Sequence, residues 1–196
     1  MITLQEQFGA IDIYLFDQLL RGNIAPGMSI FDAGCGGGRN LVYFARQGYA
    51  VSGVDPDLQA IAAVRQIAPA GDFRTETVEH NSFAEQSADV VLSSAVLHFA
   101  RDDGHFRAML AGSWRVLKPG GLFFCRLASS IGLPATQRTQ IAGRRFLLAD
   151  GSERYLVDEE LLLTLAAALN AEQVDPIKTT VVQNQRAMTT WVLRRA

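Results

Sequence analysis

The sequence predicts an α/β fold in which a mostly parallel β-sheet carries helices on both faces, a three-layer sandwich. Short apolar runs, typical of buried strands, alternate with segments whose apolar residues recur at helical spacing. A glycine-rich segment directly follows the first apolar run. Two β-rich stretches separated by residues 183–186 end the chain, which is typical of a terminal antiparallel hairpin. The 196 residues suit a single domain over 1–196.

In the first half of the chain, turn and cap residues separate helical from β-rich segments. Pro26 and Gly27 turn the chain after the first helix, Gly48 follows the second, and Asp57 stands at the N-cap position of the third. We therefore expect, in order, an N-terminal helix over about 3–22, a strand over 28–31, a helix over 39–47, a strand over 49–54, a helix over 58–67 and a strand over 73–78.

The second half continues the alternation after one interruption. Residues 129–157 show no period and contain glycine, proline and polar residues. We interpret them as an insertion over the carboxyl edge of the sheet, where open α/β folds bind ligands, and as a substrate lid. The remaining predicted elements are a strand over 89–93, a helix over 103–116, a strand over 122–127, a helix over 158–169 and hairpin strands over 174–182 and 187–193.

Composition and charge narrow the class of protein. Hydrophobic residues make up 48% of the chain, which is typical of a globular protein. The net charge is -2 and no basic run is present, so we expect no nucleic-acid partner. The two cysteines lack metal-site spacing, so we expect no metal and a reducing compartment. Acidic residues interrupt the N-terminal apolar stretch, which argues against a signal peptide, and no run approaches the ~20 apolar residues of a membrane span. We expect a cytoplasmic protein without a membrane partner, as a monomer or homodimer.

The glycine-rich segment predicts a loop that binds a nucleotide-like ligand. Glycines between a strand and a helix let a ligand approach the backbone, and the helix start offers free N–H groups. The dinucleotide pattern GxGxxG would require a glycine at position 39. Arg39 stands there, and the loop instead has Gly34, Gly36 and Gly38.

Two carboxylates beside this loop favour S-adenosylmethionine over a dinucleotide. Asp32 precedes the loop, where it would repel a pyrophosphate but attract the ammonium and sulfonium groups of S-adenosylmethionine. The carboxylate of that ligand would take N–H groups of the loop, assisted by Asn40. Asp55 ends the second predicted strand, where it can accept both ribose hydroxyls of an adenosine.

Four segments resemble the motifs of class I S-adenosylmethionine-dependent methyltransferases, in order and at the family's spacing. They are the loop 31–38, the acidic strand end 54–57, the fourth strand with its following loop 88–99, and the Leu-Lys-Pro-Gly-Gly turn 117–121. The resemblance implies a Rossmann-like fold whose mostly parallel, seven-stranded sheet has a reversed seventh strand, matched here by the terminal hairpin. The Gly-Arg-Asn run 38–40 resembles the run at this place in compact bacterial methyltransferases, which are related to tellurite-resistance and thiopurine-methylating enzymes.

The resemblance and the loop chemistry together assign a set of cofactor-binding residues. One position departs from the family, because many relatives carry an aspartate after the third strand where this chain has Thr77. Adenine would then be bound through backbone groups around Val78, with Glu79 accepting its amino group, unless Glu79 is an exposed loop residue. The predicted set is Asp32, Gly34, Cys35, Gly36, Arg39, Asn40, Asp55, Pro56, Val78, Glu79 and Ser94.

Methyl transfer from a sulfonium is an in-line displacement, for which the protein must chiefly align two partners and exclude water. His98, just past the fourth strand, is the candidate general base. The alternatives are a structural histidine and one that lines the pocket without transferring a proton. His80 and His105 are expected at the surface. Further candidates near the acceptor are Arg126, Ser129 and Ser130 at the end of the fifth strand, and Tyr14 and Phe8 on the N-terminal helix.

The acceptor is expected to be a small molecule. Residues 93–96 read Ser-Ser-Ala-Val, not the Asn/Asp-Pro-Pro-aromatic motif of the DNA amine methyltransferases, and no basic run is present. Two alternatives stay open: a non-catalytic module that binds S-adenosylmethionine, and an NAD-dependent oxidoreductase, against which Asp32, Arg39 and the terminal hairpin weigh. The residues do not specify the acceptor itself.

Overall fold

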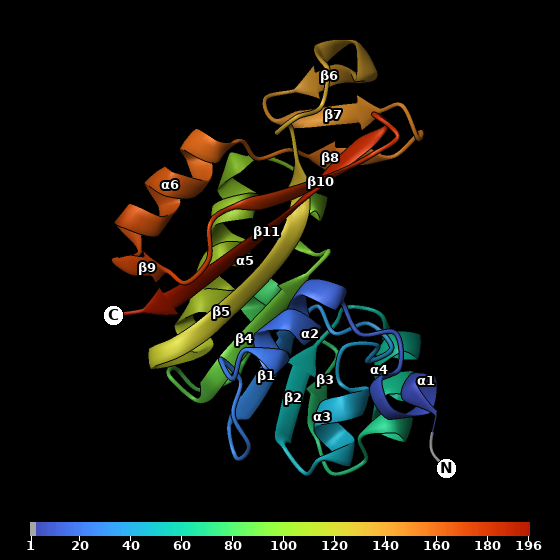
Figure 1. The fold of residues 1–196 in the computed structure, drawn as a ribbon, viewed down its shortest axis with the longest axis vertical. Coiled ribbons are helices and arrows are strands. Elements are labelled where there is room, and N and C mark those ends of the chain that lie inside the picture. Colours follow the sequence, from blue (N-terminus) through green and yellow to red (C-terminus); the bar gives the residue numbers. More distant parts are fainter. Residues whose placement is uncertain (1–2) are drawn as a thin grey trace.

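A mixed β-sheet of eight strands organises residues 3–196, which are the residues that this computed structural model describes (Figure 1). The strands are β1 (Ser29–Ala33), β2 (Ala50–Val54), β3 (Asp72–Arg74), β4 (Ala88–Ser94), β5 (Leu117–Ser129), β9 (Ala171–Gln173), β10 (Lys178–Val182) and β11 (Arg186–Arg195). Their order is β10-β11-β5-β4-β1-β2-β3, and β9 pairs with β11. β1 to β5 run parallel, whereas β11 is antiparallel to β5, β9 and β10. This order confirms the Rossmann-like fold with its reversed strand.

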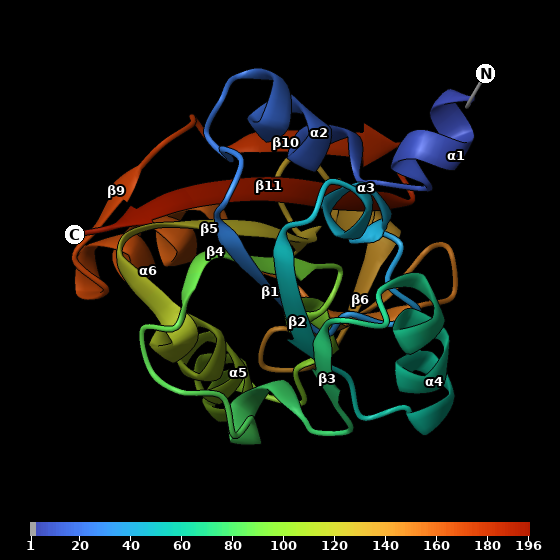
Figure 2. The same cartoon turned by 90° about the horizontal axis from the view of Figure 1, so that it is seen from below.

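Helices cover both faces of this sheet, as the alternation of elements predicted. They are α1 (Leu4–Phe8), α2 (Ile13–Leu20), α3 (Val42–Arg46), α4 (Leu58–Ile67), α5 (Asp103–Val116) and α6 (Glu159–Ala168). On β1, Ile30 packs in the core beneath α2, α3 and α4, while its neighbour Phe31 packs in the core beneath α5 and α6. Figure 2 shows α5 and α6 on the side of the sheet opposite α2 and α3.

The N-terminal segment forms two helices, so the prediction of one helix over about 3–22 was wrong. Gly9 ends α1 with φ of 62°, and a Cβ at this position would lie 2.9 Å from Val42 Cγ2. Asp12 then starts α2 because its carboxylate accepts a hydrogen bond from the Tyr14 N–H over 3.0 Å. The apolar spacing continues through the break, which hid it in the sequence.

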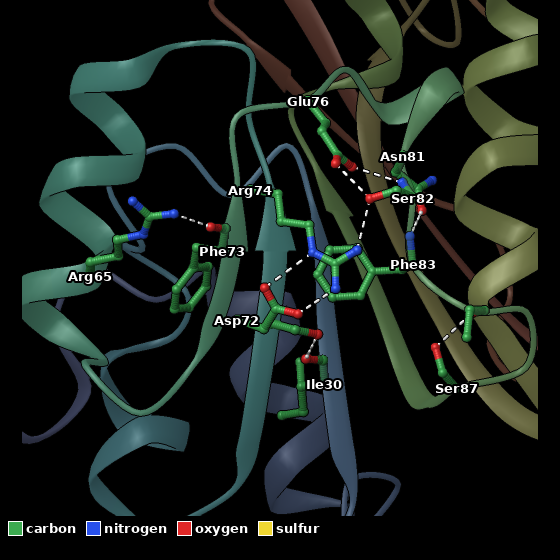
Figure 3. Close-up of polar contacts among 12 residues, drawn as sticks. Ile30, Arg65, Asp72, Phe73, Arg74, Glu76, Asn81, Ser82, Phe83 and Ser87 are labelled. Carbon is green, nitrogen blue, oxygen red and sulfur yellow. Dashed lines mark hydrogen bonds and ion pairs between the residues drawn. The ribbon is translucent and has the colours of Figure 1, made fainter.

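The third strand is shorter than predicted, because a polar network turns the chain after Arg74 (Figure 3). Arg74 donates to Ser82 Oγ over 2.8 Å, and Glu76 accepts hydrogen bonds from the Ser82 N–H and Oγ over 2.7 and 2.6 Å. The Arg74 guanidinium also lies 3.8 Å above the Phe83 ring. Val78, predicted at the end of this strand, instead begins the 3₁₀ helix η1 (Val78–His80).

The strand predicted over 174–182 begins later than expected, because its first four residues connect β9 to β10. β9 ends at Gln173 and β10 begins at Lys178, with Pro176 between them. Proline supplies no N–H to a sheet, and Asp175 accepts a hydrogen bond from Gln18 Nε2 over 2.8 Å. The hairpin between β10 and β11 is confirmed, with Gln183 and Asn184 at positive φ in its turn.

The insertion over 129–157 folds into a small antiparallel sheet past the carboxyl end of β5 (Figure 1). Its strands are β6 (Arg138–Ala142), β7 (Arg145–Leu148) and β8 (Glu153–Tyr155), preceded by the 3₁₀ helix η3 (Ala135–Gln137). Its two ends meet at the main sheet, because Ser129 and Val157 form a parallel β-bridge. Sequence periodicity did not predict this sheet, since its strands are only three to five residues long and show no regular alternation of apolar and polar residues.

Within residues 3–196, no helix combines the length and the apolar character that a membrane crossing requires.

Candidate active site

A cavity of about 860 Å³ opens at the carboxyl ends of β1, β2 and β4. Open α/β sheets bind ligands at this edge, and a volume of this size is typical of small-molecule sites. All predicted cofactor-binding residues except Asp32 line it. Its walls are formed by Ala10, Gly34, Cys35, Gly36, Gly37, Arg39, Asn40, Asp55, Pro56, Ile67, Thr77, Val78, Glu79, Ser94, Ala95, Val96, Phe99, Arg101, His105 and Met109.

The loop after β1 requires glycine at two of its positions. Gly34 has φ of 87°, and a Cβ there would lie 2.5 Å from Val96 Cγ2. Gly38 has φ of 82°, and a Cβ there would lie 2.6 Å from Val64 Cγ2. At Gly36, between them, a Cβ would have no heavy atom of another residue within 4 Å apart from its chain neighbours, so this side of the loop is open to a ligand.

Asp55 is held at both carboxylate oxygens by backbone N–H groups. Gly36 donates to Oδ2 over 2.9 Å, and Asp57 donates to Oδ1 over 3.0 Å. The carboxylate therefore has a fixed position on the cavity wall. Each oxygen keeps a further lone pair with which it can accept a ligand hydroxyl.

Asp32 lies beneath the cavity wall and does not line it. Its exposed fraction is 2%, and no group of residues 3–196 donates a hydrogen bond to its carboxylate. Burial raises its pKa to about 8; the positive charge of Arg39 opposes this shift, and the negative charge of Asp55 adds to it. A positively charged ligand group beside the loop would therefore favour the ionised form of Asp32.

Arg39, Asn40 and Ser94 line the cavity and also hold the N-terminal segment against the sheet. Arg39 donates to Ser94 Oγ over 2.9 Å and to the Ala10 carbonyl over 3.3 Å. Asn40 Oδ1 accepts a hydrogen bond from the Asp12 N–H over 3.0 Å. The first helices are therefore fixed to the cofactor loop through its polar side chains.

Glu79 and His105 form a pair on the cavity wall, so the prediction of His105 at the surface was wrong. Glu79 Oε1 and His105 Nε2 lie 3.1 Å apart, and His105 Nδ1 accepts the Arg101 N–H over 3.1 Å. Burial opposes ionisation of Glu79, but its hydrogen bonds with the backbone and with His105 give it a lowered pKa. His105 occupies the first turn of α5, and helices that follow parallel strands begin at the carboxyl edge of the sheet. That topological rule is the signal that could have placed it.

His98 is buried away from the cavity, which argues against the general base that we expected. It does not line the cavity, and its Nδ1 accepts the Ala128 N–H over 3.1 Å. Burial, with the nearby Arg154 charge, lowers its pKa to about 3. The ring is therefore neutral and its accepting nitrogen is occupied within the fold, which is the structural role that we kept as an alternative.

Cys35 lines the cavity, but burial raises the pKa of its thiol, so it is not a nucleophile at neutral pH. Phe99, which also lines the cavity, is 57% exposed. The centroid of its ring lies 4.8 Å from the guanidinium carbon of Arg154, which belongs to the insertion. The insertion therefore touches the rim of the cavity at Phe99. Residues 3–196 contain no group of three or more His, Cys, Asp or Glu side chains arranged to hold a metal ion.

The other candidates near the acceptor have mixed positions. Ser129 Oγ accepts a buried hydrogen bond from Thr189 Oγ1 over 2.6 Å, and Phe8 stacks on Tyr43. These two residues serve packing. Arg126 donates from Nη1 to Asp12 Oδ2 over 3.0 Å, and its guanidinium lies 5.4 Å from the Tyr14 ring centroid. Arg126 and Tyr14 thus lie together beside the Asp12 network that reaches the cavity.

Known proteins are similar in sequence to about half of this chain. Residues 31–125 match the family model described as a methyltransferase domain. The chain is 34% identical over 110 residues to an uncharacterized methyltransferase of Synechocystis, across 55% of this chain and 51% of that protein. It is 33% identical over 102 residues to the ubiquinone biosynthesis O-methyltransferase of Rhizobium leguminosarum, across 50% of this chain and 39% of that protein. The chain thus spans about half the length, or less, of these curated relatives.

Solved structures share the fold over nearly the whole chain. An S-adenosylmethionine-dependent methyltransferase of Methanosarcina mazei is similar with a TM-score of 0.72 at 19% identity, covering 90% of this chain and 96% of that one. The 1,6-didemethyltoxoflavin-N1-methyltransferase of Burkholderia thailandensis, solved with S-adenosylhomocysteine, has a TM-score of 0.69 at 23% identity, covering 91% and 75%. Residues 31–125 thus match a methyltransferase domain, and the chain has the fold of S-adenosylmethionine-dependent methyltransferases.

Proposed function

We propose that the protein transfers a methyl group from S-adenosylmethionine to a small-molecule acceptor by in-line displacement. The observation that carries this proposal is the buried Asp32 carboxylate, which has no hydrogen-bond partner among residues 3–196 and lies directly before the cavity loop. A cationic cofactor compensates such a charge, whereas a pyrophosphate would be repelled by it. When bound, S-adenosylmethionine supplies a methyl group made electrophilic by its sulfonium.

The cavity residues fit the parts of this cofactor. Asp55, fixed by two backbone N–H groups, is placed to accept the ribose hydroxyls. The open side of Gly36 admits the backbone approach that the cofactor carboxylate requires. Val78 and Glu79 are on the wall assigned to adenine, and Thr77 offers a hydroxyl where relatives carry an aspartate. Arg39, Asn40 and Ser94 also line the cavity.

Catalysis would depend on alignment and exclusion of water, with no general base required of the protein. An in-line displacement on an activated methyl group needs the two partners at near-attack distance. His98 is not at the cavity, and both ring nitrogens of His105 are already engaged. An acceptor that arrives as a good nucleophile suits this site.

The remaining expectations belong to the same proposal. We propose that residues 129–157 act as a substrate lid within a single domain, which the contact between Arg154 and Phe99 supports. We keep the cytoplasm as the proposed location and a monomer or homodimer as the proposed state; Cys35 and Cys125 are both unpaired and buried, in keeping with a reducing compartment.

Calorimetric titration with S-adenosylmethionine, S-adenosylhomocysteine and NAD tests the cofactor. Binding of the two adenosyl compounds without NAD binding is expected, and the reverse result would establish the oxidoreductase alternative. Labelled S-adenosylmethionine incubated with fractionated metabolites then tests transfer. Transfer of label to a small molecule is expected, and tight cofactor binding without any transfer would leave the non-catalytic binding module as the function.

A further inference from the structure

Three polar side chains from neighbouring strands lie in one row beside the cavity. Arg126 on β5 is in register with Ser94 on β4 and with Thr190 on β11. Side chains of paired residues on adjacent strands point to the same face of a sheet. Ser94 lines the cavity, so this row extends from the cavity wall across β5 to β11. The row lies on the sheet face that α2 covers, because Phe124 and Val192, two residues away, pack in the same core as Leu15.

Two atoms of this row are buried without a hydrogen-bond partner in residues 3–196. They are Arg126 Nε and Thr190 Oγ1. Arg126 has five N–H donors, and within residues 3–196 its side chain donates one hydrogen bond, from Nη1 to Asp12. Leaving buried polar atoms unpaired is costly, so each such atom in a native protein calls for an explanation, of which a bound ligand is one. Both atoms can donate a hydrogen bond, and their residues are paired across β5 and β11.

The charge around the row is positive. The fully buried Asp12 carboxylate faces two guanidinium groups, with Arg126 Nη1 at 3.0 Å and Arg39 Nη2 at 3.9 Å from its Oδ2. One negative charge against two positive charges leaves a net charge of about +1 in this network. An anionic ligand group would balance it, and a guanidinium binds planar oxygen pairs such as carboxylates especially well.

The surroundings of the row are apolar. The Tyr14 ring lies 5.4 Å from the Arg126 guanidinium on one side. On the other side, Met188 and Ala128 form the next pair along β11 and β5, and Phe146 of the insertion packs in the same cluster. Met188, Phe146 and Tyr14 are only partly buried. A ligand between α2 and the insertion would therefore meet a charged row next to an apolar wall.

We infer that the methyl acceptor is a small apolar or aromatic molecule that bears a carboxylate, and that Arg126 and Thr190 bind this carboxylate. The inference rests on the proposed methyltransferase function and adds the acceptor class to it. The bound carboxylate fixes the position of the acceptor. Ser94, at the other end of the row, lies on the wall of the cofactor cavity. The body of the acceptor packs against Met188 and Phe146.

Calorimetric titration of the S-adenosylhomocysteine-saturated protein tests this inference. The probes are benzoate, phenylacetate and hexanoate, each compared with its primary amide at millimolar concentration. At least one acid is expected to bind about tenfold or more tightly than its amide. Equal binding of acids and amides, or no binding of any of the three acids, would overturn the inference.

Substitutions then locate the binding. Arg126→Gln and Thr190→Val are each expected to remove most of the preference for the acid. The control Arg107→Gln, on the exposed face of α5 outside the cavity, is expected to keep it. Loss of the preference in Arg101→Gln, at the cavity mouth, with retention in Arg126→Gln would place the anion elsewhere and refute the assignment.

Two checks keep folding and cofactor binding apart from acceptor binding. Arg126→Gln leaves Asp12 with a weaker partner, whereas Thr190→Val removes a hydroxyl that makes no hydrogen bond within residues 3–196 and should fold as stably as the wild type. Both variants should bind S-adenosylhomocysteine as the wild type does, because neither residue lines the cavity. Failure of the wild type to bind this compound would refute the proposed function, whereas cofactor binding without the acid preference refutes only the acceptor class.

Discussion

The backbone N–H of Gly36 donates to the Asp55 carboxylate over 2.9 Å, and this contact joins the loops that follow β1 and β2. Asp55 is thereby oriented by the same loop that forms the cavity floor. A ligand that displaces or bends the loop also moves the carboxylate, so the two halves of the cofactor site are mechanically linked. Their contributions to cofactor affinity are therefore expected to be coupled.

Replacing Asp55 should weaken cofactor binding strongly. Asp55→Ala removes charge-assisted hydrogen bonds to the ribose and frees the Gly36 N–H, which should cost about 2–3 kcal/mol of binding free energy. Titration calorimetry with S-adenosylhomocysteine measures it. The matched control is Asp57→Ala, which removes the N-cap of α4 and should cost about 1 kcal/mol of folding stability while affinity is kept. Equal losses of affinity in both variants would assign the effect to α4.

The affinity for S-adenosylmethionine should rise with pH until about pH 8, where it should level off. Because burial raises the pKa of Asp32 to about 8, the carboxyl is largely protonated at neutral pH, and a cationic cofactor binds best to its ionised form. Binding at lower pH must therefore release a proton. Calorimetry in two buffers of different ionisation enthalpy measures that release. Asp32→Asn should bind more weakly and without pH dependence; an unchanged pH profile would exclude Asp32 as its source.

Asp32 should also shape the stability of the free protein. Its pKa is about 8 in the fold against an ordinary value of 3.8, so the folded state binds more protons between these values. The free energy of unfolding should then fall as pH rises from about 4 to about 8 and change little above, as far as this group contributes. Urea unfolding across this range measures it. Asp32→Asn should flatten the profile and be more stable than the wild type at pH 8, and parallel profiles would contradict the assignment.

Replacing His98 should reduce stability without acting on chemistry. His98→Ala removes a buried ring and leaves the Ala128 N–H unpaired, which should cost about 3 kcal/mol or more of folding free energy. The exposed His80→Ala is the control and should change stability little. Once an acceptor is identified, the rate per folded molecule should be the same in all three proteins. If the rate falls only in His98→Ala when equal fractions are folded, His98 acts as a general base after all.

The low pKa of His98 adds an acid-side effect. Because burial, with Arg154, lowers this pKa to about 3 from 6.5, the unfolded state binds more protons between the two values. The stability that His98 contributes is therefore complete above about pH 6.5 and is lost as the pH falls toward 3. Urea unfolding at pH 5 and pH 7 should show a larger drop for the wild type than for His98→Ala. Equal drops would contradict the buried neutral imidazole.

The sequence predicted the parallel strands and the cofactor loop because both depend on local patterns. β1, β2 and β4 are apolar runs, and Gly34 and Gly38 occupy positions where a Cβ would collide with Val96 and Val64. The apolar runs are visible as short stretches of sequence, and each glycine is visible at a single position. The matching wall of cavity residues follows from the parallel arrangement, in which the strand ends meet at one edge.

Other features depend on contacts between residues far apart in the sequence, which local sequence patterns do not predict. The direction of the His98 ring is set by the Ala128 N–H, thirty positions away, and His105 reaches the cavity because α5 starts beside η1. The break at Gly9 results from its packing on Val42 of α3. Arg126 was a candidate from its position on β5, but its pairing with Asp12 and its alignment with Thr190 required the assembled sheet.

The bridge between Ser129 and Val157 gives the insertion an independence from the sheet that it caps. Entry and exit lie side by side, and Tyr155 near the exit packs on Phe106 in the main core. The part of the segment before Tyr155 can therefore be shortened, lengthened or exchanged without moving β5 or α6, at a loop-closure cost that changes only slowly with length. The part of the chain that forms the cofactor cavity can thus stay constant while the insertion varies. Grafting the corresponding segment of a relative between Ser129 and Tyr155 should transfer preferences for the acceptor while the donor affinity stays the same.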